Sequence, residues 1–154
     1  MAVPSKPTLA QRIKRSLSLV LGKAATRDGD ELGRLGELAA EKHIKSLGWE
    51  IIGRNVRVPM GEADLVARDG VQYVILEVKT RVREEGQATK SAIASPLQSI
   101  TQHKRRKLRA IAAYLAKSNN WDIRNVRIDA IAIEFERREN ETLSLAGCRL
   151  VHVG

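Results

Sequence analysis

The sequence predicts an α/β fold in which a mixed β-sheet is flanked by helices within a single domain. Its segments follow one another as a helix, three strands, a second helix and two strands, an order typical of a sheet covered by helices. Residues 71–78 are nearly continuous in apolar side chains, as in a central strand that is buried on both faces. A length of 154 residues, 43% of them hydrophobic, suffices for one domain with a substantial core.

Residues 1–30 are predicted to form a basic N-terminal arm, and residues 31–154 the folded domain. Apolar residues of the arm fall at helical spacing and indicate a short amphipathic helix; they are Leu9, Ile13, Leu17, Val20 and Leu21. Three roles of this arm stay open: it can pack on the domain, it can be disordered, or it can make an accessory nucleic-acid contact. A secretory signal is not expected, because Ser18 interrupts an apolar run that is already too short.

Residues 31–47 are predicted to form the first complete helix, with Asp30 as a possible N-cap and Gly48 as the C-terminal stop. Its buried stripe is expected to contain Ala40, Ile44 and Leu47. Glu37 lies about 20° from Ile44 around the helix, so its carboxylate is at the edge of the stripe and can point toward the sheet. The alternative is an exposed acid that the dipole of the first helical turn favours.

A strand over residues 49–58 leads into a β-hairpin. The turn of the hairpin is assigned to Asp69-Gly70, a dipeptide that favours a tight two-residue turn. In this register Asp64 faces Ile75 and is a diagonal neighbour of Glu77, and side-chain alternation places Lys79 on the same face. Diagonal Cα atoms lie roughly 7–8 Å apart, a span that two carboxylates can close around one divalent cation. A solvated face of an amphipathic hairpin is the alternative interpretation.

The second half of the chain predicts a mobile loop at residues 80–95, a long helix at 96–117 and strands at 126–136 and 143–153. The helix is expected to bury Ile100, Leu108, Ile111, Ala112 and Leu115. Asn119-Asn120 turns the chain into the next strand. On that strand Arg127 and Asp129 share a face, and they can pair with each other or brace the sheet.

The charge of the chain predicts a polyanionic partner. The formal net charge is +9 and the isoelectric point is near 10.1. Its densest basic run is His103-Lys104-Arg105-Arg106-Lys107 on the second long helix, which indicates phosphate binding or a solvated helix face. Only five aromatic residues are present, which disfavours a stacking platform for single-stranded bases and favours backbone recognition.

Other classes of protein find little support in the sequence. No apolar run reaches the eighteen or so residues of a transmembrane helix, so no membrane partner is expected. Cys148 is the single cysteine, which excludes a disulfide framework and suits a reducing, cytoplasmic location. The three histidines are not at zinc-site spacing, and neither a phosphate-binding P-loop nor a G-x-S-x-G nucleophile motif occurs.

Asp64, twelve intervening residues and then Glu77-Val78-Lys79 resemble the catalytic hairpin of the PD-(D/E)xK, or restriction-endonuclease-like, nucleases. A longer pattern, in matching order from about residue 30 to about residue 136, is similar to the YraN-like uncharacterised bacterial proteins. That pattern consists of Gly36-Glu37, Arg54-Asn55, Gly61-Glu62-x-Asp64-Leu65, Glu77-Val78-Lys79-x-Arg81, Lys104, Lys107-Leu108 and Arg127-x-Asp129.

This resemblance implies a restriction-endonuclease-like fold and hydrolysis of DNA phosphodiesters, at branched or damaged structures if the likeness to junction resolvases extends that far. Asp64 and Glu77 are expected to hold Mg²⁺ or Mn²⁺, since carboxylates are hard oxygen ligands. Lys79 is expected to orient water, to lend charge or to act as a base. Glu37 is the expected helix-borne assistant; the expected nucleic-acid contacts are Arg81, Lys104 and Lys107. The alternative is a nucleic-acid-binding module with this fold and no catalysis.

Overall fold

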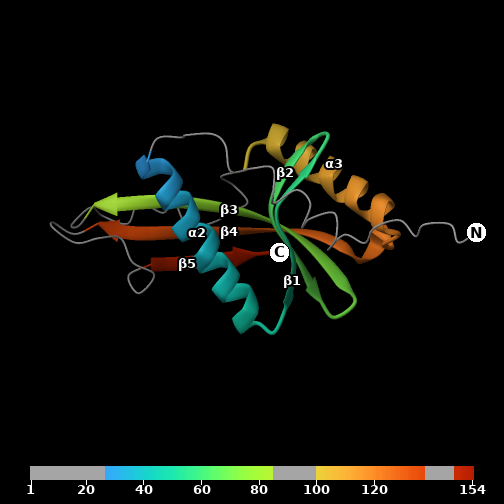
Figure 1. The fold of residues 1–154 in the computed structure, drawn as a ribbon, viewed down its shortest axis with the longest axis horizontal. Coiled ribbons are helices and arrows are strands. Elements are labelled where there is room, and N and C mark those ends of the chain that lie inside the picture. Colours follow the sequence, from blue (N-terminus) through green and yellow to red (C-terminus); the bar gives the residue numbers. More distant parts are fainter. Residues whose placement is uncertain (1–26, 85–99, 138–147) are drawn as a thin grey trace, which may run out of the picture.

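A mixed five-stranded sheet with strand order β1-β2-β3-β4-β5 forms the centre of the structure (Figure 1). The computed structural model describes residues 27–84, 100–137 and 148–154. The predicted arm, up to residue 26, lies outside the described residues. The elements are α2 (Arg27–Ser46), β1 (Glu50–Val58), β2 (Gly61–Asp69), β3 (Gln72–Glu84), α3 (Gln102–Asn119), the 3₁₀ turn η1 (Ile123–Asn125), β4 (Val126–Arg137) and β5 (Cys148–Val153). This confirms the predicted α/β class and element order, and it is consistent with a restriction-endonuclease-like fold.

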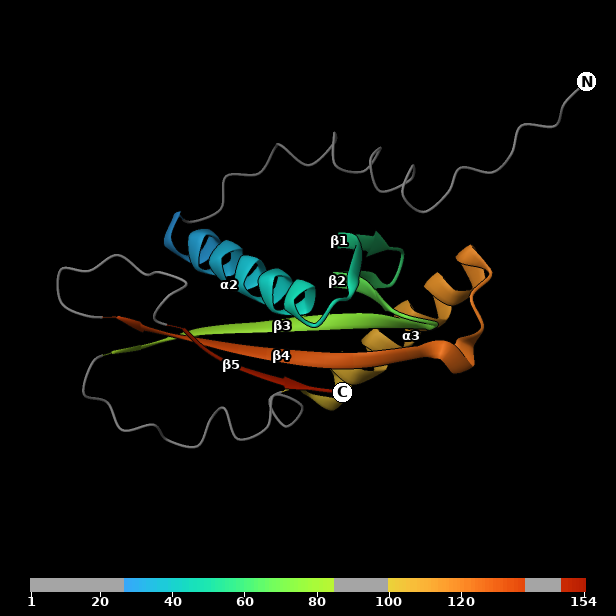
Figure 2. The same ribbon diagram turned by 90° about the horizontal axis from the view of Figure 1, so that it is seen from below.

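Among the described strands, β3 and β4 form the one parallel pair, and the other neighbouring strands are antiparallel. The chain passes α3 between β3 and β4, as a parallel pair requires a crossover connection. Figure 2 shows α2 and α3 on opposite faces of these two strands. The central strand β3 is therefore covered on both faces, which is the reason for its nearly continuous apolar sequence.

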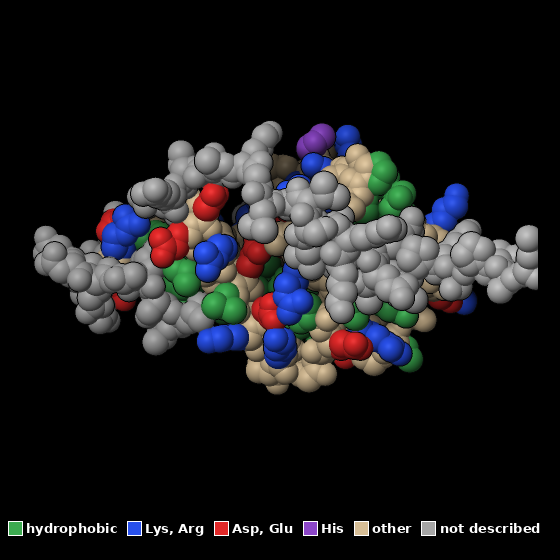
Figure 3. Space-filling view, in the orientation of Figure 1, with side chains coloured by type: hydrophobic (Ala, Val, Ile, Leu, Met, Phe, Trp, Pro, Cys, Tyr) green, Lys and Arg blue, Asp and Glu red, His purple; other side chains and the backbone are tan. Residues whose placement is uncertain are grey.

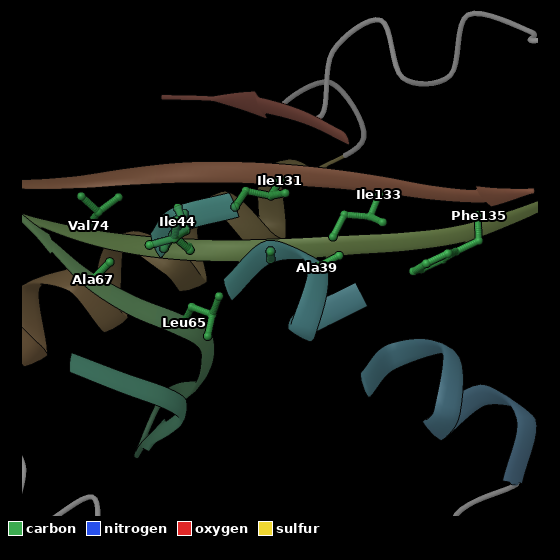
Figure 4. Close-up of a cluster of buried hydrophobic side chains, with 10 residues drawn as sticks. Ala39, Ile44, Leu65, Ala67, Val74, Ile131, Ile133 and Phe135 are labelled. Atoms are coloured by element: carbon green, nitrogen blue, oxygen red, sulfur yellow. The ribbon is translucent and has the colours of Figure 1, made fainter. Parts of the chain in front are cut away.

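Two buried clusters fill the spaces on either side of the sheet. Under α2, Ala39 and Ile44 pack against strand residues that include Leu65, Val74 and Phe135 (Figure 4). Under α3, four of the five residues predicted for its buried face pack with Ile75 and Val66 of the sheet; they are Leu108, Ile111, Ala112 and Leu115. The fifth, Ile100, is buried in the same cluster but precedes the helix. The alternation of β3 side chains between the two clusters fixes which residues can reach the site described below.

Helix α2 differs from its prediction at both ends. It is already helical at Arg27, so Asp30 lies inside the helix and is not its cap. It ends at Ser46, and Gly48 follows with a φ of 80°, the left-handed conformation of a C-terminal stop. Leu47 was predicted to be buried but is 46% exposed, because the chain leaves the helical path before it. The buried positions Ala40 and Ile44 are confirmed.

The hairpin register is shifted by two residues from the prediction. The turn residues are Gly70, with a φ of 57°, and Val71, because Asp69 pairs with Gln72. A glycine at the first turn position with positive φ is the pattern of a II′-like turn. Asp64 therefore does not face Ile75, which pairs with Val66. A shift of two preserves the faces of the strands, whereas a shift of one exchanges them.

The second half of the chain also departs from its predicted boundaries. Strand β3 continues to Glu84 in parallel register with β4, so residues 80–84 are a strand and not a loop; residues 85–95 lie outside the described residues. Helix α3 begins at Gln102, since the Thr101 side chain caps it by accepting the Lys104 N–H at 3.2 Å. Asn120 ends it with a φ of 56°, as the predicted turn requires. Strand β5 is described from Cys148.

Gly36 sets the distance between α2 and β3. A Cβ atom built on Gly36 would lie 1.8 Å from Thr80 Oγ1 and 2.9 Å from Thr80 Cβ, so rotation of the threonine cannot relieve the overlap. The absence of a side chain at Gly36 therefore allows the helix to approach the strand. This close approach carries the adjacent Glu37 to the edge of the sheet.

Gly36→Ala is expected to lower the free energy of unfolding by about 1–2 kcal/mol, because overpacking costs more than the helix propensity of alanine returns. Gly33→Ala is the matched control, since a Cβ atom there has no neighbour within 4 Å. The control is expected to raise stability by about 0.5–1 kcal/mol. Urea unfolding measures both. Equal stability of the two variants would contradict the close contact, and adding Thr80→Ala to Gly36→Ala should recover part of the loss.

Candidate active site

Asp64 and Glu77 lie opposite each other where the hairpin opens. The last ladder pair of β2 and β3 before this point is Leu65 with Leu76, so the next positions along the two strands are Asp64 and Glu77. Asp64 Oδ2 accepts the backbone N–H of Val78 at 2.7 Å. This side chain thus satisfies a backbone donor of β3 beyond the last ladder pair. In this register Asp64 and Glu77 occupy opposite positions, where the prediction made them diagonal neighbours.

Glu77 is a buried carboxylate held by two lysines. Its side chain is 3% exposed, with Lys79 Nζ 3.1 Å from Oε1 and Lys104 Nζ 2.9 Å from Oε2. Oε2 makes no hydrogen bond of good geometry, although Lys104 is within ion-pair distance. A buried carboxylate is costly unless cations compensate it, and here the two ammonium groups do so. Lysines from β3 and α3 therefore meet at a single acid.

Burial raises the pKa of Asp64 to about 6, and the negative charge of Glu77 contributes next. The Val78 N–H and the ammonium of Lys104 lower this pKa, while Glu37 raises it slightly. Two acids that share a partly dry site disfavour each other's ionised form. The carboxyl of Asp64 is thus poorly compensated and would gain from a nearby cation.

Glu37 lies on α2, which packs on the opposite face of the sheet from α3. Asn55 of β1 donates from Nδ2 to Glu37 Oε2 at 3.1 Å. Next to it, Arg54 donates to Glu41 from two nitrogens, at 2.7 and 2.6 Å, and these contacts contribute most to lowering the Glu41 pKa to about 2. This bidentate pair ties β1 to α2. The position of the Glu37 carboxylate is therefore set by its helix, α2, and by its contact with Asn55 of β1.

The acids of this cluster fit a magnesium-type ion better than a zinc ion. Asp64 and Glu77 offer carboxylate oxygens, which are ligands for Mg²⁺ or Mn²⁺, whereas zinc sites favour histidine and cysteine. Within the described residues, no three His, Cys, Asp or Glu side chains converge closely enough to form a complete cage. Mg²⁺ commonly binds through one or two carboxylates and completes its shell with water and substrate phosphates. The two acids suit that mode.

The structure brings together most of the predicted site residues. Asp64, Glu77 and Lys79 meet at the opening of the hairpin, with Lys104 from α3 paired to the same glutamate. Lys107 passes over the start of β2, where a Cβ atom on Gly61 would lie 2.1 Å from Lys107 Cε. Arg81 follows Lys79 by two positions on β3 and is half-buried.

Two contacts of this site were not predicted from the sequence. The pairing of Lys104 with Glu77 was missed, because Lys104 was assigned to phosphate alone. The contact of Asn55 with Glu37 was missed as well. A signal for the first existed in the spacing of α3, since Lys104, Lys107, Leu108 and Ile111 follow the periodicity of a single helix face.

Arg127 and Asp129 form a second network, away from the hairpin opening. Asp129 is 1% exposed and accepts from Arg127 Nε at 3.1 Å, and Arg127 also pairs with Asp69 at the hairpin turn. His152 of β5 contacts Asp129 Oδ2 at 2.9 Å, and His43 of α2 contacts His152 at 3.2 Å. Burial lowers the pKa of His43. The predicted pairing of Arg127 with Asp129 is thus confirmed, and the further contacts of the pair connect β4 with the end of β2, with β5 and with α2.

Charge is distributed unevenly over the two helices. Figure 3 shows acidic and basic side chains mixed on the face formed by α2. Helix α3 contains no acidic residue, and its exposed side carries basic residues that include His103, Arg106 and Arg109. No helix in the described part of the chain has the length and apolar composition that a membrane crossing requires. Positive potential is therefore concentrated on the α3 side.

Comparison with known proteins gives one consistent result. Residues 36–133 match the model of the uncharacterised protein family UPF0102. A UPF0102 protein of Moorella thermoacetica is 36% identical over 107 residues, covering 70% of this chain and 83% of that protein. The similar protein of Beutenbergia cavernae is 38% identical over 107 residues, with coverages of 70% and 85%. That of Acidothermus cellulolyticus is 36% identical over 132 residues, with coverages of 79% and 93%.

Proposed function

The chain belongs to the uncharacterised protein family UPF0102, and we propose that it is a Mg²⁺- or Mn²⁺-dependent endonuclease that hydrolyses DNA phosphodiesters. One observation carries this proposal: Asp64 and Glu77 lie opposite each other where the hairpin opens, and Lys79 pairs with the carboxylate of Glu77. A phosphodiester needs added positive charge when water displaces its leaving oxygen. The two carboxylates can bind a divalent cation next to the ammonium of Lys79, and both would supply this positive charge.

In this proposal Asp64 and Glu77 hold the cation, which offsets the charge of the scissile phosphate when it is bound. The backbone N–H of Val78 fixes one oxygen of Asp64, and no other hydrogen bond to this carboxylate forms from the described residues. Glu77 is oriented by burial and by its two lysines. Lys79, whose side chain is 42% exposed, holds its ammonium 3.1 Å from Glu77 Oε1, where it can stabilise the transition state or orient water. Glu37 of α2 is proposed to assist from the other side of the hairpin.

DNA is proposed to approach from the side of α3. This helix carries basic residues and no acidic ones, and two of them, Lys104 and Lys107, extend to the hairpin that bears the acids. Phosphate contacts of this kind position a duplex without reading its bases. Arg81, beyond Lys79 on β3, continues the basic track on the same strand. The mixed charges of α2 make that helix a weaker surface for a polyanion.

The test is cleavage of linear, nicked, flapped and four-way DNA by the purified protein with Mg²⁺ or Mn²⁺. We expect at least one substrate to be cut, and we expect excess chelator to stop the reaction. Asp64→Ala, purified in parallel, controls for contaminating nucleases. Cleavage that persists in chelator, or equally in Asp64→Ala, would refute the proposal.

A nucleic-acid-binding module without catalysis is the second candidate. The pairing of both Glu77 oxygens with lysines favours it, since this charge balance needs no metal. Such a module would bind DNA through the basic residues of α3 and cut none of the substrates with either metal.

A further inference from the structure

Asn55 interrupts β1 with a left-handed backbone. Its φ is 46°, and among the described residues only Asn120 shares a positive φ without being glycine. Arg54 pairs with Leu65 and Val56 with Ala63, so Asn55 lies across the ladder from Asp64. A positive φ within a strand is unfavourable for most residues, and asparagine tolerates it better than most. The strand is therefore distorted at the position that faces the candidate metal ligand.

The amide of Asn55 contacts Glu37, the expected assisting acid of α2. Asn55 Nδ2 donates to Glu37 Oε2 at 3.1 Å, and Asn55 lies across the ladder from Asp64, so this contact holds the Glu37 carboxylate beside the strand pair that bears Asp64. The other oxygen, Oε1, has no hydrogen bond to the described residues, so it is available to a cation or to a bound water. One donor thus fixes the carboxylate without neutralising it.

The neighbouring contacts hold Asn55 in place. Arg54 is tied to Glu41 of α2 by its bidentate pair, and the buried Val56 anchors the strand on the other side. The left-handed conformation lies between these anchors. It turns the amide toward α2, where Gly36 allows the helix to approach the sheet.

We propose that Asn55 is a positioning residue that orients Glu37 toward the cation held by Asp64 and Glu77. This inference rests on the proposed function. Partners that orient the groups around a metal typically change metal affinity or activity by about 10–100-fold when they are removed. Because Glu37 is oriented by one hydrogen bond in this structure, we expect the lower end of that range.

Asn55→Gly is the variant of choice, because glycine adopts positive φ freely and removes only the amide. It is expected to weaken Mn²⁺ binding, measured by titration calorimetry without DNA, by about 10-fold. Cleavage with Mn²⁺ should fall by a similar factor. Asn120→Gly is the matched control, since it replaces the other left-handed asparagine at the end of α3. We expect the control to leave both quantities unchanged.

A second variant separates positioning from a general structural effect. Asn55→Gly combined with Glu37→Gln is expected to bind Mn²⁺ no more weakly than Glu37→Gln alone, since both changes act through one contact. Additive losses, or wild-type Mn²⁺ affinity in Asn55→Gly, would overturn the inference. The ¹H–¹⁵N signals of the Asn55 side-chain amide give a readout independent of catalysis. They should shift in Glu37→Gln, and unmoved signals would exclude the contact even if no DNA is cut.

Discussion

Glu77→Gln is expected to lower the rate of metal-dependent DNA cleavage by more than about 100-fold, which exceeds the usual effect of residues that only support a metal ligand. Its affinity for DNA should remain equal or rise. Glutamine keeps the shape of the side chain but removes the anion that pairs with Lys79 and Lys104. Both ammonium groups are then available to phosphates. Single-turnover cleavage and DNA binding at fixed salt measure the two quantities.

Glu50→Gln is the control for this prediction, because Glu50 is an exposed acid at the start of β1. It removes the same charge away from the hairpin opening and should leave cleavage unchanged. Retained cleavage in Glu77→Gln would remove the central residue of the proposed nuclease. If the wild-type protein cuts nothing while Glu77→Gln binds DNA more tightly, the non-catalytic binding module is favoured.

The shared face of Asp64 and Glu77 could be predicted from the sequence although the hairpin register could not. Side chains alternate with a period of two, so the error of two residues at the turn left both acids on the same face. Local turn preference favoured Asp69-Gly70, whereas the ladder places Gly70-Val71 at the turn. The long-range pairing of β3 with both neighbours outweighs a local preference of this size.

Contacts between segments that are distant in the chain could not be predicted from the sequence. The pairing of Lys104 with Glu77 depends on where α3 begins, and that start depends on the Thr101 cap rather than on apolar periodicity. The neighbouring pair Arg127 and Asp129 was predictable, because residues two apart on a strand share a face. Their extension to His152 and His43 joins three elements, and no local pattern encodes it.

Asp64→Asn is expected to stabilise the protein by as much as about 3 kcal/mol at pH 7.5, which follows from a pKa of about 6 in the folded state against the usual 3.8. Above pH 6 the folded protein must hold an ionised carboxyl that is buried beside Glu77. Asparagine removes this charge, and its side-chain oxygen can still accept the Val78 N–H. A residue that destabilises the fold is consistent with selection for chemistry at that position.

The stabilisation expected from Asp64→Asn depends on pH, and its direction follows from the raised pKa of Asp64. Because the folded-state pKa is raised, the folded protein binds a proton between about pH 6 and pH 4 that the unfolded chain does not bind. The penalty from Asp64 is therefore complete above pH 6 and fades as the pH falls toward 4. Urea unfolding of both proteins from pH 7.5 to pH 4 should show the advantage of Asp64→Asn shrinking toward zero. Groups away from Asp64, such as the histidines, titrate equally in both proteins and cancel in the difference. An advantage that stays constant with pH, or a variant less stable than wild type at pH 7.5, would mean that Asp64 is well compensated in the folded protein without a cation.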